Sequence, residues 1–203
     1  MKKIILIAEL SLFFIGLPML YRFDFLPGFW KLIPLLLFFS YCLITLTNAK
    51  KISVEDLKLK EIKRTNWLKL FFFPFMLFTT LIILSPDNIF ADFDNPRVLI
   101  AIITYPLLSS LPQEIIYRKF FYFRYSDLIK NKYLLIGLNA ILFSIAHIYF
   151  QNYIALILTF LGAIAFSFTY LKSRSLIFVS IEHSMYGLAL LCSDMNQYFY
   201  KAF

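Results

Sequence analysis

Glycine, cysteine and charged residues are scarce in this sequence, and each shortage argues against a class of protein. With five glycines in 203 residues, the chain shows neither the glycine-rich, broken half-helices nor the paired repeats typical of small transporters. Its two cysteines, Cys42 and Cys192, are too few for a disulfide framework, and both fall in apolar segments where we expect them to pack. Charged residues make up only 16% of the chain, and its length suits roughly six to eight spans of about 20 residues with short connections, which leaves no room for a separate soluble domain.

Apolar residues, in contrast, are abundant. They account for 61% of the chain and aromatic residues for 20%, and the mean hydropathy is +0.75. A soluble globular domain is about 45–50% apolar, so this composition indicates a polytopic membrane protein. The net charge of +8 comes mainly from basic residues in short loops beside apolar segments, where they set topology and meet anionic lipid. We therefore expect the lipid bilayer, and no nucleic acid, as a partner.

Seven apolar segments are long enough to cross a bilayer, for which about 20 residues are needed. They cover residues 4–21, 29–47, 68–84, 98–121, 133–150, 154–171 and 176–191. They predict an all-α fold, a polytopic transmembrane helix bundle in a single domain over 1–203, with N-terminal spans in 1–97 and a core in 98–191. Basic residues cluster at the N-terminus and after the second, fourth and sixth spans, which predicts a cytoplasmic N-terminus.

Two segments have alternative interpretations. Lys2 and Lys3, followed by an apolar run, look like the start of a signal peptide, but no small-residue cleavage site follows, so we expect a first span instead. Residues 48–66 mix charged with apolar residues and predict either a short amphipathic helix on the membrane surface or a solvated linker.

Three of the predicted spans carry candidate site residues at spacings of four, and positions four apart lie on the same side of a helix. These residues are Gln113, Glu114, Tyr117 and Arg118 in the fourth span, Asn139, Phe143 and His147 in the fifth, and Glu182, His183, Tyr186 and Gly187 in the seventh. Inserting one ionisable side chain into a membrane costs about 2.5–3.5 kcal/mol. Several ionisable residues on separate spans therefore indicate a function beyond crossing the membrane, and we expect these residues to form one site.

These residue types suit hydrolysis inside a membrane. A carboxylate and an imidazole together activate water, and further donors stabilise the developing oxyanion. Taken singly, the Glu114–Arg118 pair also fits a structural ion pair, and each histidine fits an interhelical hydrogen bond. The histidine clusters typical of zinc sites are absent from the sequence, so we expect no metal, and hydrolysis by activated water needs no organic cofactor.

The three motifs resemble those of the CPBP family, which includes CAAX-type proteases and bacteriocin-processing or self-immunity proteins and is regarded as glutamic-type intramembrane endopeptidases. The family pattern is Glu-Glu-x-x-x-Arg, Phe-x-x-x-His and His-x-x-x-Asn on successive membrane helices. Here it becomes Gln113-Glu114-x-x-x-Arg118, Phe143-x-x-x-His147 and His183-x-x-x-Gly187. The resemblance covers roughly residues 105–190 and implies a catalytic core in 98–191 and a location in the bacterial inner (cytoplasmic) membrane.

Two positions depart from the family pattern. Gln113 stands where the family has the first glutamate, which activates water together with the first histidine, and Gly187 replaces an asparagine that helps the second histidine hold the oxyanion. A glutamine amide is not a general base. The resemblance therefore implies that Glu114 takes over with His147, oriented by Arg118, or that Glu182 reaches in.

The remaining roles follow from the same resemblance. His183 would be the electrophilic donor, assisted by Tyr186, Asn139 or Gln113. The resulting hypothesis is an intramembrane endopeptidase that hydrolyses a peptide bond of a membrane-associated protein or peptide. The alternative is a non-catalytic relative of the self-immunity type, which binds peptides in the same cavity.

Overall fold

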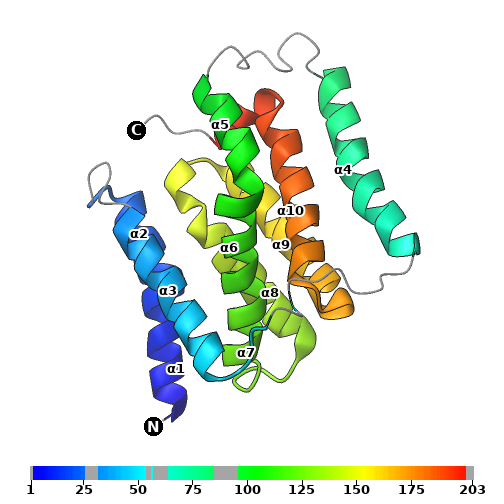
Figure 1. Ribbon diagram of the computed structural model, residues 1–203. Helices are drawn as coiled ribbons and strands as arrows, with labels where there is room; N and C mark the ends of the chain where they lie inside the picture. The colour runs from blue at the N-terminus through cyan, green and yellow to red at the C-terminus, as the bar shows by residue number, and fades with distance from the viewer. Residues whose placement is uncertain (1, 26–31, 54–55, 57–63, 85–95, 200–203) are drawn as a thin grey trace.

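The computed structural model describes residues 2–25, 32–53, 56, 64–84 and 96–199, and these residues form helices joined by turns, without strands. Figure 1 shows the helices side by side in one bundle. The N-terminal half contains α1 (Lys2–Ser11), a π-helical turn η1 (Leu12–Gly16) and α2 (Leu17–Arg22) in one continuous run, then α3 (Leu32–Asn48) and α4 (Arg64–Leu84).

The C-terminal half holds the polar motifs. A continuous helical run contains α5 (Pro96–Tyr105), the π-turn η5 (Pro106–Ser110), α6 (Leu111–Glu114), the π-turn η6 (Ile115–Phe120) and α7 (Phe121–Tyr125). It is followed by α8 (Lys132–Ala146), a short η7 (Ile148–Phe150), α9 (Tyr153–Ser173), α10 (Leu176–Leu191) and η8 (Asp194–Tyr198).

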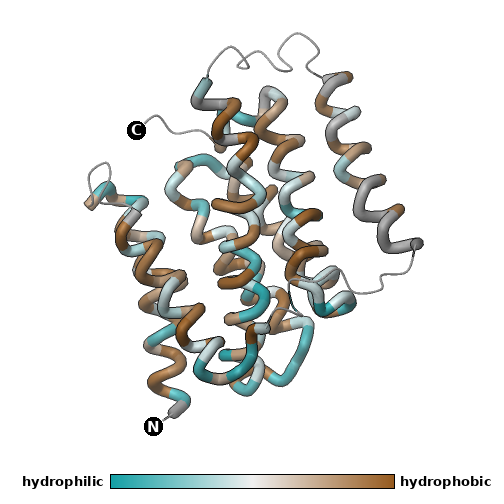
Figure 2. Tube along the Cα trace, in the orientation of Figure 1, coloured by the Kyte–Doolittle hydropathy of each residue, from teal (hydrophilic) through white to brown (hydrophobic). Residues whose placement is uncertain are grey.

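The outer faces of these helices are apolar, as expected for a bundle in lipid. Ile83, Leu108 and Ile103 are 74–77% exposed, and Figure 2 shows hydrophobic residues recurring along the helices. Lys3–Arg22, Lys132–Phe150 and Tyr153–Ser173 are long and apolar enough to cross a membrane. The predicted all-α membrane bundle is confirmed, while the number of seven spans remains a prediction. Residues 54–55 and 57–63 of the 48–66 segment lie outside the described residues, so its two interpretations remain open.

Two π-helical turns flank the Gln113–Glu114 pair of the first motif. Pro106 begins the turn η5, and a second turn, η6, follows Glu114. Proline lacks an N–H and interrupts the regular hydrogen-bond ladder of a helix. Such π-turns are rare and occur frequently at functional sites, because they reorient the side chains next to them.

Polar contacts fix the helices around this run. On the N-terminal side, the Glu9 carboxylate on α1 accepts hydrogen bonds from Arg124, Tyr125 and Tyr41, at 2.7 to 2.8 Å for the shortest contact with each residue. On the other side, the Ser110 hydroxyl donates to the Ser180 carbonyl of α10 at 2.9 Å. The α5–α7 run is therefore held between α1 and α10.

The helices that carry the two histidines begin at defined residues. Asn131 and Ser175 cap the starts of α8 and α10, because their side chains accept hydrogen bonds from backbone N–H groups of the first turn. Asn152 caps α9 in the same way. These caps fix where each helix begins and hence which face turns toward α6.

Candidate active site

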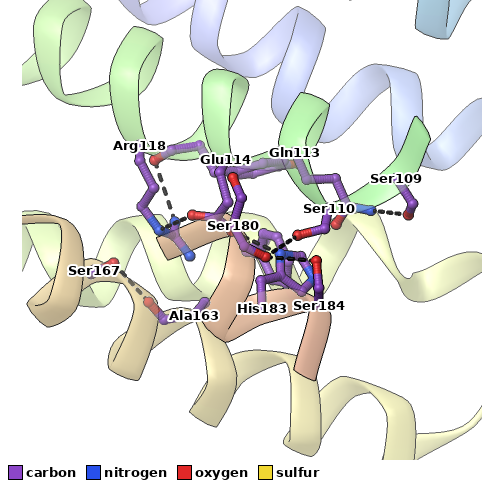
Figure 3. Close-up of polar contacts among 12 residues, drawn as sticks. Ser109, Ser110, Gln113, Glu114, Arg118, Ala163, Ser167, Ser180, His183 and Ser184 are labelled. Atoms are coloured by element: carbon purple, nitrogen blue, oxygen red, sulfur yellow. Dashed lines mark hydrogen bonds and ion pairs between the residues drawn. The ribbon is translucent and has the colours of Figure 1, made fainter. Parts of the chain in front are cut away.

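Glu114 lies at the centre of a buried polar cluster. Its side chain is fully buried, with Oε2 3.1 Å from Arg118 Nε and Oε1 2.8 Å from His183 Nδ1. Figure 3 shows the carboxylate between these two partners, one on its own helical run and the other on α10. Both carboxylate oxygens are therefore engaged by cationic or N–H-bearing groups.

Arg118 is held from two further helices. Its guanidinium donates to the Asn139 side-chain oxygen of α8 and, at 3.3 Å, to the Tyr117 carbonyl. Asn139 donates in turn to the same carbonyl at 2.7 Å, and the Ser167 hydroxyl of α9 donates to the Asn139 oxygen at 3.2 Å. A fully buried arginine with this many partners is a fixed charge, which keeps Glu114 in place opposite it.

The contacts of His183 assign its two ring nitrogens. Because Nδ1 faces the Glu114 carboxylate, it carries a proton and donates it. In the neutral ring Nε2 is then the acceptor, and it lies 3.2 Å from the Tyr105 hydroxyl. The ring also stacks on Phe166, with centroids 4.7 Å apart. A carboxylate that holds an imidazole in this way fixes its tautomer and the orientation of its ring.

His147 ends α8, and its ring nitrogens are also distinguished. Nδ1 lies 2.8 Å from the Phe143 carbonyl, an acceptor, so Nδ1 carries the proton. The Nε2 lone pair of the neutral ring is therefore available to another group. The Phe143 ring contacts both imidazoles, with centroids 4.8 Å from His147 and 5.7 Å from His183.

Both histidines line one cavity of about 470 Å³. Its polar lining consists of Tyr105, Ser109, Gln113, His147, Thr159, His183 and Tyr186. The rest of the lining is apolar, with residues of α4, α9 and α10 and with Phe143, Phe150 and Phe199. Glu114 and Arg118 do not line this cavity and lie behind His183.

Gln113 presents an amide to the cavity. Its Nε2 donates to the Ser109 hydroxyl at 2.8 Å, whereas its buried Oε1 has no hydrogen-bond partner among the described residues. A buried carbonyl oxygen without a partner is costly. A donor on a bound molecule would satisfy it.

Tyr105 is the residue that the sequence analysis missed. It lines the cavity and contacts His183, and a Cβ atom added to Gly187 would overlap the end of its ring. The absence of a side chain at Gly187 is therefore what allows the tyrosine hydroxyl to reach His183. The available signal was the spacing of Tyr105, Ser109 and Gln113, which are four residues apart along one helical run.

The other predicted residues divide into two groups. Phe143, Tyr186 and Gly187 line the cavity. Tyr117, Asn139 and Glu182 do not: the first two brace Arg118, and Glu182 forms a side-chain hydrogen bond with Thr169 of α9. No three His, Cys, Asp or Glu side chains converge as a metal site among the residues that the structure describes. The catalytic role of each residue remains a prediction.

An apolar helix bundle with a buried carboxylate, two cavity-facing imidazoles and a partly apolar cavity is an integral membrane protein with an enzyme-like site. Residues 95–189 match a family model described as type II CAAX prenyl endopeptidase Rce1-like. No curated protein and no solved structure matches the chain. The family match confirms the resemblance of these residues to the CPBP family of CAAX-type proteases. It supports a CAAX-type intramembrane protease as the kind of function, with a peptide or protein as substrate.

Replacing Glu114 by alanine is expected to lower the free energy of unfolding by about 3–5 kcal/mol, because it leaves the buried Arg118 guanidinium without its counter-ion. Thermal unfolding of the detergent-solubilised protein measures the effect. Glu182→Ala is the control, since this carboxylate forms no ion pair among the described residues. Equal melting temperatures for the two variants would contradict a structural role for the Glu114–Arg118 pair.

Proposed function

We propose that the chain is an intramembrane endopeptidase that hydrolyses a peptide bond of a membrane-associated protein or peptide in the cavity between α4, α5, α8, α9 and α10. The observation that carries this proposal is that two imidazoles line one cavity. In each ring a hydrogen bond holds Nδ1, from His147 to the Phe143 carbonyl and from His183 to Glu114, and so fixes the tautomer. One imidazole serves as the base, and the other serves as part of the donor set for the oxyanion.

His147 is the general base. Its Nδ1–H is held by the Phe143 carbonyl, which leaves Nε2 to remove a proton from water. The water oxygen then forms a bond to the carbonyl carbon of the substrate, and the carbonyl oxygen becomes an oxyanion. When the C–N bond breaks, the proton on His147 passes to the leaving amine, which returns the imidazole to its neutral form.

Tyr105 and His183 are the donors for the oxyanion. With His183 protonated, Nδ1–H donates to Glu114, Nε2–H donates to the Tyr105 oxygen, and the tyrosine O–H is free to donate to the oxyanion. A donor aimed at developing charge in a cavity of low polarity contributes strongly to rate. In this scheme Tyr105 occupies the place left by Gly187, where the family has asparagine.

Glu114 acts through His183 and is a positioning residue in this proposal. The hypothesis drawn from the sequence was that Glu114 activates water together with His147. The contacts of the carboxylate with Arg118 and His183, and its position behind the cavity lining, favour a different role. Arg118 holds the carboxylate, and the carboxylate stabilises the imidazolium of His183.

A second candidate function is peptide binding without cleavage, and Gln113 favours it. The unpaired Oε1 of this amide is a suitable acceptor for a backbone N–H of a bound peptide, and an amide at this position supplies no base. The apolar lining around it suits apolar side chains of a membrane peptide.

The substitution Gln113→Glu separates the two candidates. We expect the wild type to cleave members of a lipidated and unlipidated peptide library, and Gln113→Glu to raise kcat by about tenfold or more because it adds a carboxylate base to the cavity. Mass spectrometry of the products measures cleavage by the wild type and by the variant. Ser109→Ala is the control, because it removes the hydrogen-bond partner of the Gln113 amide without adding a carboxylate. If the wild type is silent and Gln113→Glu cleaves, the protein is a binding relative and the proposed catalysis is wrong.

A further inference from the structure

Phe166 on α9 packs face to face against the His183 imidazole of α10. The two rings are nearly parallel, with 20° between their planes and 4.7 Å between their centroids. Both residues are buried, with 3% and 5% of their surfaces exposed. The Phe143 and Tyr105 rings meet the same imidazole edge-on instead, at 69° and 79°. The face of the imidazole is therefore in contact with Phe166.

The hydrogen bonds of His183 do not fix the plane of its ring. Nδ1 lies 2.8 Å from Glu114, and Nε2 lies 3.2 Å from the Tyr105 hydroxyl. A ring that is held at two nitrogens can still turn about the line that joins them. A flat ring packed against one face opposes this rotation, so Phe166 supplies a constraint that the two hydrogen bonds leave out.

The same contact favours a positive charge on His183. The face of an aromatic ring is electrically negative and attracts a cation placed over it, more strongly where water is excluded. In the proposed hydrolysis, His183 becomes an imidazolium while Tyr105 donates to the oxyanion. Because the Phe166 ring stacks on this imidazole at a buried position, it stabilises the positive charge as it forms.

Phe166 is itself held by residues of other elements. The guanidinium carbon of Arg118 lies 5.8 Å from the centroid of its ring, and the Tyr186 ring lies 5.9 Å away. Arg118 also holds the Glu114 carboxylate, at 3.1 Å. The same arginine therefore contacts both the carboxylate at Nδ1 of His183 and the ring on its face.

We propose that Phe166 is a positioning residue for hydrolysis, whose ring fixes the plane of the His183 imidazole and stabilises the imidazolium. The inference rests on the role of His183 in the proposed function, in which Phe166 has no part. Phe166 acts through the imidazole and not on the reacting atoms.

The first test is nuclear magnetic resonance of the full chain in detergent, which needs no substrate. The chain has two histidines, so labelled histidine gives two sets of ring signals. A stacked aromatic ring shields the protons over its face, so Phe166→Leu is expected to move the His183 ring protons downfield. The His147 signals are the internal reference, because the Phe143 ring beside this imidazole stays in place. Unchanged His183 signals would overturn the proposal.

The second test separates the charge effect from packing. Phenylalanine with one, two or three ring fluorines replaces Phe166, which weakens the negative face and keeps the shape of the ring. We expect kcat for peptide cleavage to fall stepwise, by about tenfold across the series, with little change in KM. Phe199 is the matched control, since it lines the same cavity and its ring packs 5.6 Å from that of Phe150.

The two tests distinguish a failure of this inference from a failure of the proposed function. A wild type that cleaves no peptide would contradict the proposed function. A wild type that cleaves, with the same kcat for every fluorinated ring at position 166, would overturn the role of Phe166 alone. An equal fall in kcat for the same series at Phe199 would also overturn it, because Phe199 packs on Phe150.

Discussion

Replacing His147 by alanine lowers kcat by about 10²–10⁴, because the proposed general base is lost. The fold is expected to tolerate this change, since His147 follows the last residue of α8 and its Nδ1 contacts a carbonyl of that same helix. Peptide cleavage in liposomes measures the rate, and thermal unfolding checks the fold. Tyr186→Phe is the control, because it changes another polar side chain of the same cavity and leaves the base in place.

Added imidazole distinguishes a base from a structural residue. The alanine variant leaves space beside Phe143, and free imidazole that enters this space is expected to restore part of the cleavage rate. A variant that had merely disturbed the fold would not respond. Wild-type kcat in His147→Ala would contradict the assignment of His147 as the base.

Replacing Tyr105 by phenylalanine is expected to lower kcat by about 10²–10³ with little change in KM, because it removes one donor to the oxyanion and keeps the ring. The ¹⁵N chemical shifts of His183 are expected to change as well, since its Nε2 loses the tyrosine contact. Tyr186→Phe again serves as the control and is expected to leave kcat and the His183 chemical shifts unchanged.

Gly187 provides a reciprocal test of the same contact. A side chain there overlaps the end of the Tyr105 ring, so Gly187→Asn alone is expected to push the hydroxyl away from His183 and to lower kcat as Tyr105→Phe does. The double variant with Tyr105→Ala and Gly187→Asn makes room for the asparagine and is expected to be more active than Tyr105→Ala alone. Such non-additivity is expected for residues in contact. Strictly additive effects of the two substitutions would contradict the idea that Tyr105 fills the role of the family's asparagine.

Much of the fold was predictable from the sequence because the apolar segments are long and separated by charged loops. The described helices overlap all seven predicted segments, including the run through Pro106 and Pro112 to Glu114. Three helices, which Asn131, Asn152 and Ser175 cap, begin within one residue of the predicted spans 133–150, 154–171 and 176–191. Composition and spacing decide these features locally, without knowledge of the packing.

The pairing of side chains between helices was less predictable. The sequence indicated that Glu114, Arg118 and the two histidines belong together, because each is costly to bury. It did not indicate that Glu114 contacts His183, because that depends on how far α10 is rotated toward α6. Glu182 precedes His183 in sequence, but neighbouring helix residues point in different directions, and it forms a hydrogen bond with Thr169 of α9.

Tyr105 could not be identified from motifs because its contact with His183 depends on the lack of a side chain at Gly187. Taken alone, Gly187 shows only that the asparagine of the family pattern is missing. Only the three-dimensional arrangement shows that the tyrosine hydroxyl occupies the neighbouring space and contacts the same histidine. A departure from a family pattern on one helix was therefore linked to a residue 82 positions earlier in the sequence.

The most direct test of the central claim is hydrolysis by the wild-type protein in H₂¹⁸O. The protein in liposomes is incubated with a membrane peptide library, and the products are analysed by mass spectrometry. The account predicts fragment pairs in which the new carboxyl terminus carries ¹⁸O, with formation lost in His147→Ala and strongly reduced in Tyr105→Phe. Intact peptides with the wild type, or cleavage that persists unchanged in His147→Ala, would contradict hydrolysis by this site.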